Sequence, residues 1–272
     1  MKGSFLKMKK NLFKIFALGL ASVMTFAATG CSESSSNSSS SSSTSSSSQS
    51  SATSYITDGV VENQMAMPQA GEQIAVFTVE GYGTFKARLF PEAAPKAVDN
   101  FVKLASEGKY NGVPFHRVVE DFMIQSGDTS LNGGDGQSIY GAGFEVEFNE
   151  SVHHYSGALA VARTTSKSSG QSTQFYVVSN ESAKNYTESD WQSLEAQTGV
   201  EFDEQTRANY AQYGGAPFLD MNYTVFGQVF EGQDVVDNIA AANVEMNPQT
   251  GEESSPNPEI ILSSVEITTY QG

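Results

Sequence analysis

The sequence predicts a mostly β fold, a closed and mainly antiparallel barrel, on three observations. Short apolar or alternating segments recur after residue 70, Gly-rich turns such as 132–136 separate several of them, and only two helices have the apolar spacing of core elements. Many strands with few core helices are typical of a barrel. The expected strands span residues 74–79, 83–90, 115–118, 122–126, 158–162, 174–178, 224–229 and 260–268.

The first two strands are expected to form a hairpin. Residues 74–79 are apolar and β-branched, while residues 83–90 alternate, with Phe85, Ala87 and Leu89 on one side. The Glu-Gly-Tyr-Gly sequence that joins the two segments supplies the turn.

Two core helices follow from apolar spacing. Pro91 and Pro95 mark the start of the first, because proline is accepted in a first helical turn, and Gly108 marks its end. The positions at helical spacing between them are Ala94, Ala97 or Val98, Phe101, Leu104 and Ala105. The second helix is expected at 233–241, and the polar residues 244–258, which include Gly and Pro, indicate a loop.

Residues 181–216 interrupt the strand pattern. The segment 187–191 resembles a helix start, with acidic residues in its first turn, and residues 203–213 indicate a second helix. We interpret this stretch as a helical insertion between two barrel strands.

The N-terminal residues have the pattern of an export signal. Residues 1–30 carry five lysines, an apolar stretch at 15–28 and small residues before Cys31. The apolar stretch is shorter than the roughly 20 residues that span a bilayer. Cys31 resembles the lipidated acceptor cysteine of a bacterial lipobox, although Ala28 stands where such boxes more often have Leu. A secreted protein with one free thiol is the alternative.

A tether separates this signal from the fold. Residues 32–54 hold 17 serines in 23 positions, so they cannot form a core and are expected to be flexible. A linker at 55–71 then leads to a single domain at 72–270, which is long enough for a real core. This order predicts a lipid-anchored protein on the extracytoplasmic face of the cell membrane.

The charge balance argues against nucleic acid as a partner. The full chain has a formal net charge of −16, and loss of the five signal lysines leaves ten cationic against 31 acidic side chains, a net charge of about −21. Nucleic-acid binding depends on cationic side chains that neutralise phosphates. We interpret the acidity as a source of solubility and of repulsion from an anionic envelope.

Residues 115–128 carry the most chemical information. Arg117 offers a permanent charge and five donors in a rigid fork, and Gln125 donates and accepts without a change of charge. Phe122 and Met123 offer an apolar surface for a ring. This set suits a reaction with no covalent step, no proton transfer and no cofactor, such as rotation about an X-Pro peptide bond.

Five motifs occur in a characteristic order and spacing: Phe-His-Arg-Val at 115–118, Phe-Met-Ile-Gln-Ser-Gly-Asp at 122–128, Ser-Ile-Tyr-Gly at 138–141, Gln-Phe-Tyr-Val at 174–177 and Val-Phe-Gly-Gln-Val at 225–229. Together they resemble the cyclophilin-type peptidyl-prolyl isomerases, and residues 95–101 are similar to that family's first helix. The likeness covers about residues 72–180 and 217–268. It implies an eight-stranded barrel capped by two helices, in agreement with the strand and helix pattern.

The resemblance also implies roles for residues at matching positions. Arg117 matches the catalytic arginine, and Gln125 matches the amide that follows it. The substrate-binding positions are matched by Phe122, Met123, Gly133, Ala162, Arg163, Gln174, Tyr176, Phe218, Leu219 and Tyr223. Arg163 replaces an asparagine, Tyr176 a phenylalanine and Tyr223 a histidine. Phe218 stands where some members carry tryptophan.

Strand alternation supports a shared site independently. Met123 and Gln125 fall on one face of their strand, as Gln174 and Tyr176 do on theirs. Plain explanations exist for single residues, since an arginine between apolar residues is often a surface cation and a Phe-Met pair is compatible with barrel core.

Other chemistries lack their motifs. His153 and His154 are adjacent rather than at metal-ligand spacing, so they are expected to be exposed or in a turn, and no metal site is predicted. The chain has no Gly-x-Ser-x-Gly, no Gly-x-Gly-x-x-Gly and no phosphate loop.

Three functions are left open by the sequence. The first is an isomerase that assists the folding of exported proteins, with proline-containing segments as its partners. The second is a non-catalytic module that binds such segments, and the third is an adhesion or scaffold protein whose insertion contacts a partner. A monomer is expected.

Overall fold

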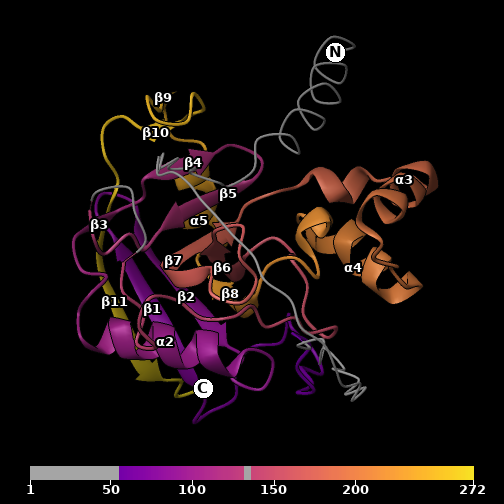
Figure 1. Ribbon diagram of the computed structural model, residues 1–272, viewed down its shortest axis with the longest axis horizontal. Coiled ribbons are helices and arrows are strands. Elements are labelled where there is room, and N and C mark those ends of the chain that lie inside the picture. The colour runs from indigo at the N-terminus through magenta and orange to yellow at the C-terminus, as the bar shows by residue number, and fades with distance from the viewer. Residues whose placement is uncertain (1–54, 132–135) are drawn as a thin grey trace, which may run out of the picture. The chain divides into compact units, whose positions relative to one another are not determined.

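The computed structural model of the chain describes residues 55–131 and 136–272. Within these residues, nine antiparallel strands form the main sheet, which curls around an apolar core (Figure 1). The strand order in the sheet is β3-β11-β1-β2-β8-β6-β7-β5-β4. The strands are β1 Gln73–Val79, β2 Gly83–Leu89, β3 Val113–Pro114, β4 Arg117–Val119, β5 Met123–Ser126, β6 Ala158–Arg163, β7 Gln171–Val178, β8 Val225–Glu231 and β11 Ile261–Thr269.

The nine strands correct the expectation of a closed, eight-stranded barrel. The additional strand is β3, whose two residues precede the strand expected at 115–118, and the expected strand is found as β4, which begins at Arg117. Strand β3 pairs with β11 and β4 pairs with β5, at opposite ends of the sheet. Pro114 has no N–H to continue the first ladder. Phe115 still donates its N–H to Ile260 O at 2.8 Å, after which the chain passes to the other edge. The result is a curled half-barrel whose two edge strands are consecutive in the sequence.

An aromatic core fills the inside of the curled sheet. Phe77 and Phe85 stack with their ring centroids 4.4 Å apart, and Phe101 meets Phe175 edge-on at 5.6 Å. Phe101 comes from helix α2 (Pro95–Ser106), and helix α5 (Gln233–Ala240) also turns apolar side chains toward this core. Both core helices predicted from apolar spacing are therefore confirmed.

Strands β5 and β7 are buried on both faces. Ile124 and Val177 belong to the aromatic core, whereas Met123, Tyr176 and Val178 belong to a second apolar cluster on the other face of the sheet. This separation follows from the two-residue period of a strand. We call this second apolar cluster, to which Met123, Tyr176 and Val178 belong, the outer cluster. It lies on the face of the sheet that carries the predicted site residues.

Residues 55–71, expected as a linker, lie against the domain instead. Thr57 donates its hydroxyl to Ala93 O at 2.6 Å and its N–H to Phe148 O at 2.8 Å, and the buried Val61 joins the outer cluster. The folded domain therefore includes residues that precede β1. The expected signal peptide, Cys31 and the Ser-rich tether lie outside the described residues. In the part of the chain that the structure describes, no helix has both the length and the apolar character needed to cross a bilayer.

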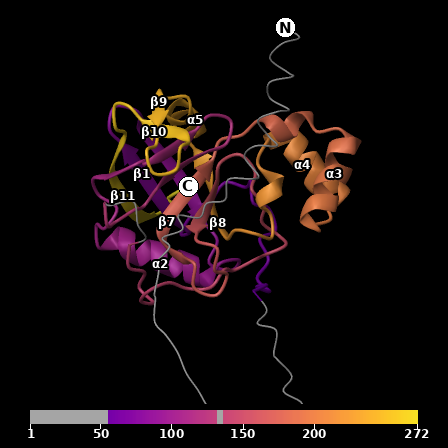
Figure 2. The same cartoon turned by 45° about the horizontal axis from the view of Figure 1, so that its top comes forward.

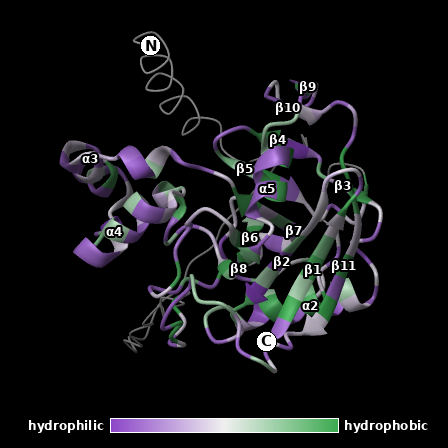
Figure 3. Ribbon diagram, turned by 180° about the vertical axis from the view of Figure 1, so that it is seen from behind, coloured by the Kyte–Doolittle hydropathy of each residue, from purple (hydrophilic) through white to green (hydrophobic). Residues whose placement is uncertain are grey.

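The insertion at 181–216 contains both expected helices, α3 (Glu188–Thr198) and α4 (Glu204–Tyr213), after the 3-10 turn η1 (Ser182–Asn185). A reciprocal capping box between Thr187 and Asp190 starts α3. A small separate core holds the insertion together, made of Tyr155, Ala183, Trp191, Leu194, Phe202 and Tyr210. Figures 2 and 3 show the two helices set apart from the sheet, and the colours of Figure 3 show that their residues are mainly hydrophilic.

A hairpin of β9 (Val244–Met246) and β10 (Glu253–Pro256) occupies residues 244–258, where a loop was expected. Asn247 explains the difference. Its N–H donates to Glu252 O at 2.7 Å, and its side-chain oxygen accepts from Gln249 N at 2.9 Å, so this one residue closes the turn. Because β10 lies beside β4, the hairpin reaches the predicted site (Figure 1).

Candidate active site

Polar side chains form a chain across three adjacent strands. Arg117 on β4 pairs in register with Gln125 on β5, and its Nη1 lies 3.4 Å from Gln125 Oε1. Gln125 Nε2 in turn donates to Oε1 of Gln174 on β7 at 2.8 Å. Because Gln125 is buried, its amide needs these partners. The structure thus brings together the arginine and both glutamines that the sequence singles out.

The predicted apolar residues gather beside this polar chain. The members of the outer cluster that were predicted as substrate-binding are Phe122, Met123, Ala162, Tyr176 and Leu219. The Arg117 guanidinium borders them, with its Cζ 5.8 Å from the Phe122 ring centroid and its Nη1 3.8 Å from Met123 Sδ. A cation therefore stands at the edge of an apolar wall.

Tyr223 and Arg163 form another edge of the outer cluster. The Tyr223 ring meets Tyr176 at an interplanar angle of 85°, with centroids 6.0 Å apart. Arg163 Cζ lies 4.7 Å from the Tyr223 centroid, while its Nε donates to Asn222 O at 2.8 Å. The arginine that replaces the family asparagine is thus held by its own neighbours, through hydrogen bonds and a cation–π contact.

Phe218 links the outer cluster to the insertion. It lies in the 3-10 turn η2 (Pro217–Leu219), which follows the insertion, and its ring centroid is 5.7 Å from that of Phe122. It also contacts the small core of the insertion. The remaining predicted residues, Gly133 and Cys31, lie outside the described residues.

Arg117 has a partner that the sequence analysis did not identify. Its Nε donates to Glu252 Oε2 at 2.6 Å, and its Nη2 donates to Glu252 Oε1 at 2.9 Å. The two side chains are only 16% and 26% exposed. No local pattern indicates this pair, because Glu252 lies 135 residues further along the chain in a segment that resembled a loop.

A family model described as the cyclophilin type peptidyl-prolyl cis-trans isomerases matches residues 74–267. The chain belongs to this family. The prediction of an enzyme of the cyclophilin type is thereby confirmed.

Two relatives whose names assign them to the peptidyl-prolyl cis-trans isomerases are similar over most of their length. The protein of Staphylococcus saprophyticus is 38% identical over 197 residues, which are 72% of this chain and 93% of the relative. The protein of Staphylococcus aureus strain COL is 36% identical over 200 residues, which are 73% of this chain and 93% of the relative.

Solved cyclophilins share the fold. A crystal structure of a cyclophilin type peptidyl-prolyl cis-trans isomerase from Cryptosporidium parvum, obtained in the presence of the dipeptide Ala-Pro, matches with a TM-score of 0.54 and 23% identity. The match covers 72% of this chain and 99% of that one.

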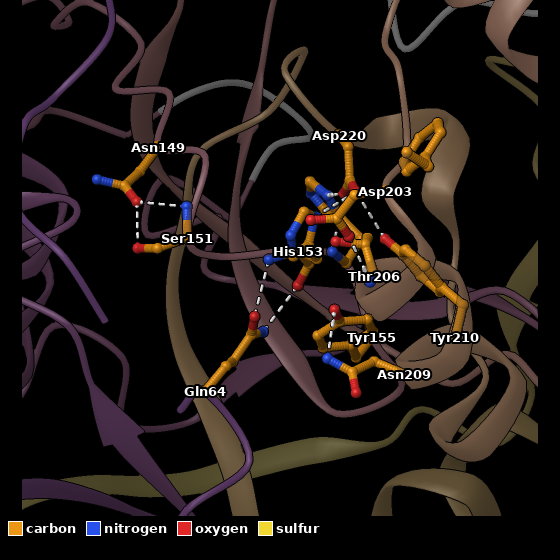
Figure 4. A network of polar contacts seen from close by, with 12 residues as sticks. Gln64, Asn149, Ser151, His153, Tyr155, Asp203, Thr206, Asn209, Tyr210 and Asp220 are labelled. Atoms are coloured by element: carbon orange, nitrogen blue, oxygen red, sulfur yellow. Dashed lines mark hydrogen bonds and ion pairs between the residues drawn. The ribbon is translucent and has the colours of Figure 1, made fainter. Parts of the chain in front are cut away.

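Next to the outer cluster, this cyclophilin carries a buried polar network centred on Asp220 (Figure 4). Its carboxylate accepts from His153 Nδ1 at 2.8 Å, from His154 Nδ1 at 2.7 Å and from Tyr210 Oη at 2.8 Å. Burial alone raises the pKa of the Asp220 carboxyl, but the hydrogen bonds from the two histidines outweigh it and hold the pKa well below its usual range. The network therefore contains a stable buried carboxylate.

Tyr176 joins this network to the outer cluster. Its hydroxyl lies 3.0 Å from His154 Nε2, and the two rings are nearly parallel, with centroids 6.1 Å apart. Because Nδ1 of the same imidazole faces Asp220, Nε2 is the acceptor for the Tyr176 hydroxyl. Burial raises the pKa of Tyr176 well above its ordinary value, so the hydroxyl keeps its proton.

The expectation of exposed or turn histidines is wrong for His154, whose side chain is 1% exposed. Asp220 supplies the buried acceptor that makes this position possible, and it follows His154 by 66 residues, so no local sequence pattern indicates the pairing. Within the described ranges, no group of three His, Cys, Asp or Glu side chains has an arrangement suited to a metal ion.

Proposed function

We propose that this chain isomerises X-Pro peptide bonds of exported polypeptides while lipid on Cys31 anchors it, as a monomer, to the outer face of the cell membrane. The observation that carries the catalytic part is the Arg117 guanidinium, which stands between the glutamine pair and the outer cluster. The export signal, Cys31 and the Ser-rich tether support the location.

The reaction requires a barrier of roughly 18–20 kcal/mol to be lowered, because the C–N bond has partial double-bond character. When the amide twists, the proline nitrogen becomes pyramidal and regains a lone pair. A donor that is fixed near this nitrogen stabilises the twisted state more than either planar state, which is the condition for catalysis. Arg117 is the proposed donor, and Gln125 orients it through Nη1.

The remaining predicted residues are assigned to binding. Phe122, Met123, Tyr176 and Leu219 supply the apolar surface for the proline ring, and Phe218 and Tyr223 border it. We assign Gln174, Ala162 and Arg163 to holding the flanking backbone of the substrate. The crystal structure of the Cryptosporidium relative in the presence of Ala-Pro supports proline-containing segments as partners.

An isomerisation assay with a proline peptide tests the catalytic role. The protein is the chain from Ser32 to Gly272, and Arg117→Ala is expected to lower kcat/KM by on the order of a hundredfold, since one preorganised donor contributes roughly 3–4 kcal/mol. Arg88→Ala is the matched control, because Arg88 also forms a partly buried ion pair, with Glu72 at 2.8 Å, but on β2. Full activity of the Arg117→Ala protein would refute the assignment.

The same assay separates the isomerase from a binding module. A module that only holds proline segments binds the peptide but leaves its isomerisation rate at the uncatalysed value. The location is tested separately, by labelling cells with a fatty-acid analogue. Cys31→Ser should remove the label and release the protein from the membrane fraction.

A further inference from the structure

Arg117 and Glu252 form a fork-to-fork ion pair. The Nε and Nη2 edge of the guanidinium faces both carboxylate oxygens, at 2.6 and 2.9 Å. Pairs of this geometry are directional as well as strong, because two parallel N–H···O bonds fix the plane of the guanidinium. Because the Arg117 and Glu252 side chains are both mostly buried, water competes less for their hydrogen bonds.

The hairpin presents Glu252 from a structured turn. Glu252 O accepts from Asn247 N at 2.7 Å, and Gly251 N donates to Asn247 O at 2.8 Å. The Asn247 side-chain oxygen also accepts from Gln249 N at 2.9 Å and from Thr250 N at 3.3 Å. These hydrogen bonds hold the backbone of Glu252 in the hairpin turn, so its side chain extends from a fixed backbone position.

The other edge of the guanidinium is held weakly. On that side the contacts of Nη1 with the described residues are long, 3.4 Å to Gln125 Oε1 and 3.8 Å to Met123 Sδ. A guanidinium has five N–H donors, and Glu252 takes two of them. The edge that faces Gln125 and the outer cluster therefore keeps donors that a substrate can use without breaking the ion pair.

We infer that Glu252 is a positioning residue, which clamps the Nε and Nη2 edge of Arg117 so that Nη1 faces the site of the twisted amide. This inference rests on the proposed isomerase function. Burial raises the pKa of the Glu252 carboxyl, but hydrogen bonds and charge from Arg117 outweigh it and bring the pKa below its ordinary value, so the clamp stays charged at neutral pH.

The opposite role is a brake, in which the carboxylate neutralises Arg117 until substrate displaces it. The contacts favour the clamp, because displacement would break the two short bonds and keep the two long ones. The two roles predict opposite changes in rate when Glu252 is removed.

The test compares Glu252→Ala with Glu253→Ala in the chain from Ser32 to Gly272. Glu253 is the exposed neighbour in the same hairpin, so its variant changes the net charge equally without touching Arg117. Glu252→Ala is expected to lower kcat on a proline peptide by on the order of tenfold with little change in KM, since misorientation of the donor affects the transition state more than binding. Glu253→Ala should match the parent chain. Unchanged or higher kcat in Glu252→Ala would overturn the inference.

A second set of variants excludes a merely structural role. In an Arg117→Ala background, Glu252→Ala should cause no further loss of rate, because a residue that acts only through Arg117 has nothing left to position. An equal loss in both backgrounds would instead assign Glu252 to folding.

A spectroscopic measurement tests the inference even if the chain has no isomerase activity. Such a result would refute the proposed function but would not test whether Glu252 holds Arg117. The Nε–H of Arg117, assigned by its absence in Arg117→Ala, should give a slowly exchanging NMR signal in the parent chain and in Glu253→Ala. The signal should be lost by fast exchange in Glu252→Ala. A signal that persists there shows that Glu252 does not hold the guanidinium.

Discussion

The hydroxyl of Tyr176 and Nε2 of His154 lie 3.0 Å apart, and this contact ties the outer cluster to the buried carboxylate of Asp220. Tyr210, on α4, donates to the same carboxylate at 2.8 Å. The insertion is therefore connected to the proline-binding surface proposed here by buried hydrogen bonds, in addition to the apolar contacts of Phe218. Stability of the insertion and the shape of that surface are expected to be coupled.

Tyr176→Phe tests the contribution of the hydroxyl separately from that of the ring. The variant leaves the His154 Nε2 acceptor without its partner, so the free energy of unfolding should fall by about 1–3 kcal/mol. The ring remains in the outer cluster, so kcat/KM should stay within roughly threefold of the parent chain. Chemical denaturation and the peptide assay measure the two effects.

Tyr223→Phe serves as the matched control, because Tyr223 has the same ring type at the edge of the same cluster and no hydrogen bond of its hydroxyl is found among the described residues. Its unfolding free energy should change little. A strong loss of activity in Tyr176→Phe would mean that the hydroxyl contacts substrate and not the network alone.

Asp220→Asn removes the charge at the centre of the network. In the parent chain, two carboxylate oxygens accept hydrogen bonds from His153, His154 and Tyr210. The asparagine amide has only one acceptor oxygen, and its NH₂ group would face one or more of these donors without being able to accept from them. Loss of one partner from a buried, paired group costs about 3–5 kcal/mol, which denaturant unfolding resolves. The exposed Asp58, changed to Asn, should alter stability by less than about 0.5 kcal/mol.

The depressed pKa of Asp220 predicts an acid-sensitive contribution to stability. A carboxyl with a lower pKa in the folded than in the unfolded state stabilises the fold above the unfolded value, and this contribution is lost as the pH falls toward the folded value. The unfolded pKa is about 3.9, so the loss should begin near that pH and continue below it. As the pH falls through the acid range, the free energy of unfolding should decrease more steeply in the parent chain than in Asp220→Asn. The same pH dependence in both proteins would contradict the assignment.

Local patterns were sufficient for the core helices, for most strands of the main sheet and for much of the site. Apolar spacing predicts α2 and α5, and strand alternation predicts that Met123 and Gln125 share a face, as the outer cluster and the polar chain show. The signals are local because one element with one buried face must repeat its apolar residues at a fixed period.

What the sequence could not show depends on contacts between distant residues. Glu252 and Arg117 are 135 residues apart in the sequence, and His154 and Asp220 are 66 apart. Neither pairing therefore produces a periodic pattern in the sequence. The hairpin at 244–258 was hidden for a related reason. Its turn is closed by the Asn247 side chain, and polar turn residues resemble a loop in composition.

Gln125→Leu tests the middle of the polar chain. The variant removes the acceptor for Arg117 Nη1 and the donor for Gln174 Oε1, while the side chain of similar size keeps the strand filled. The Nη1 contact with Gln125 Oε1 is long, at 3.4 Å, so its loss should cost about 0.5–1.5 kcal/mol, and kcat/KM should fall roughly twofold to tenfold. Gln192→Leu, on the exposed face of α3, is the control and should leave the rate unchanged. Because Glu252 still holds the other edge of Arg117, the loss should be smaller than in Arg117→Ala; an equal loss would show that the ion pair alone cannot keep the guanidinium in place.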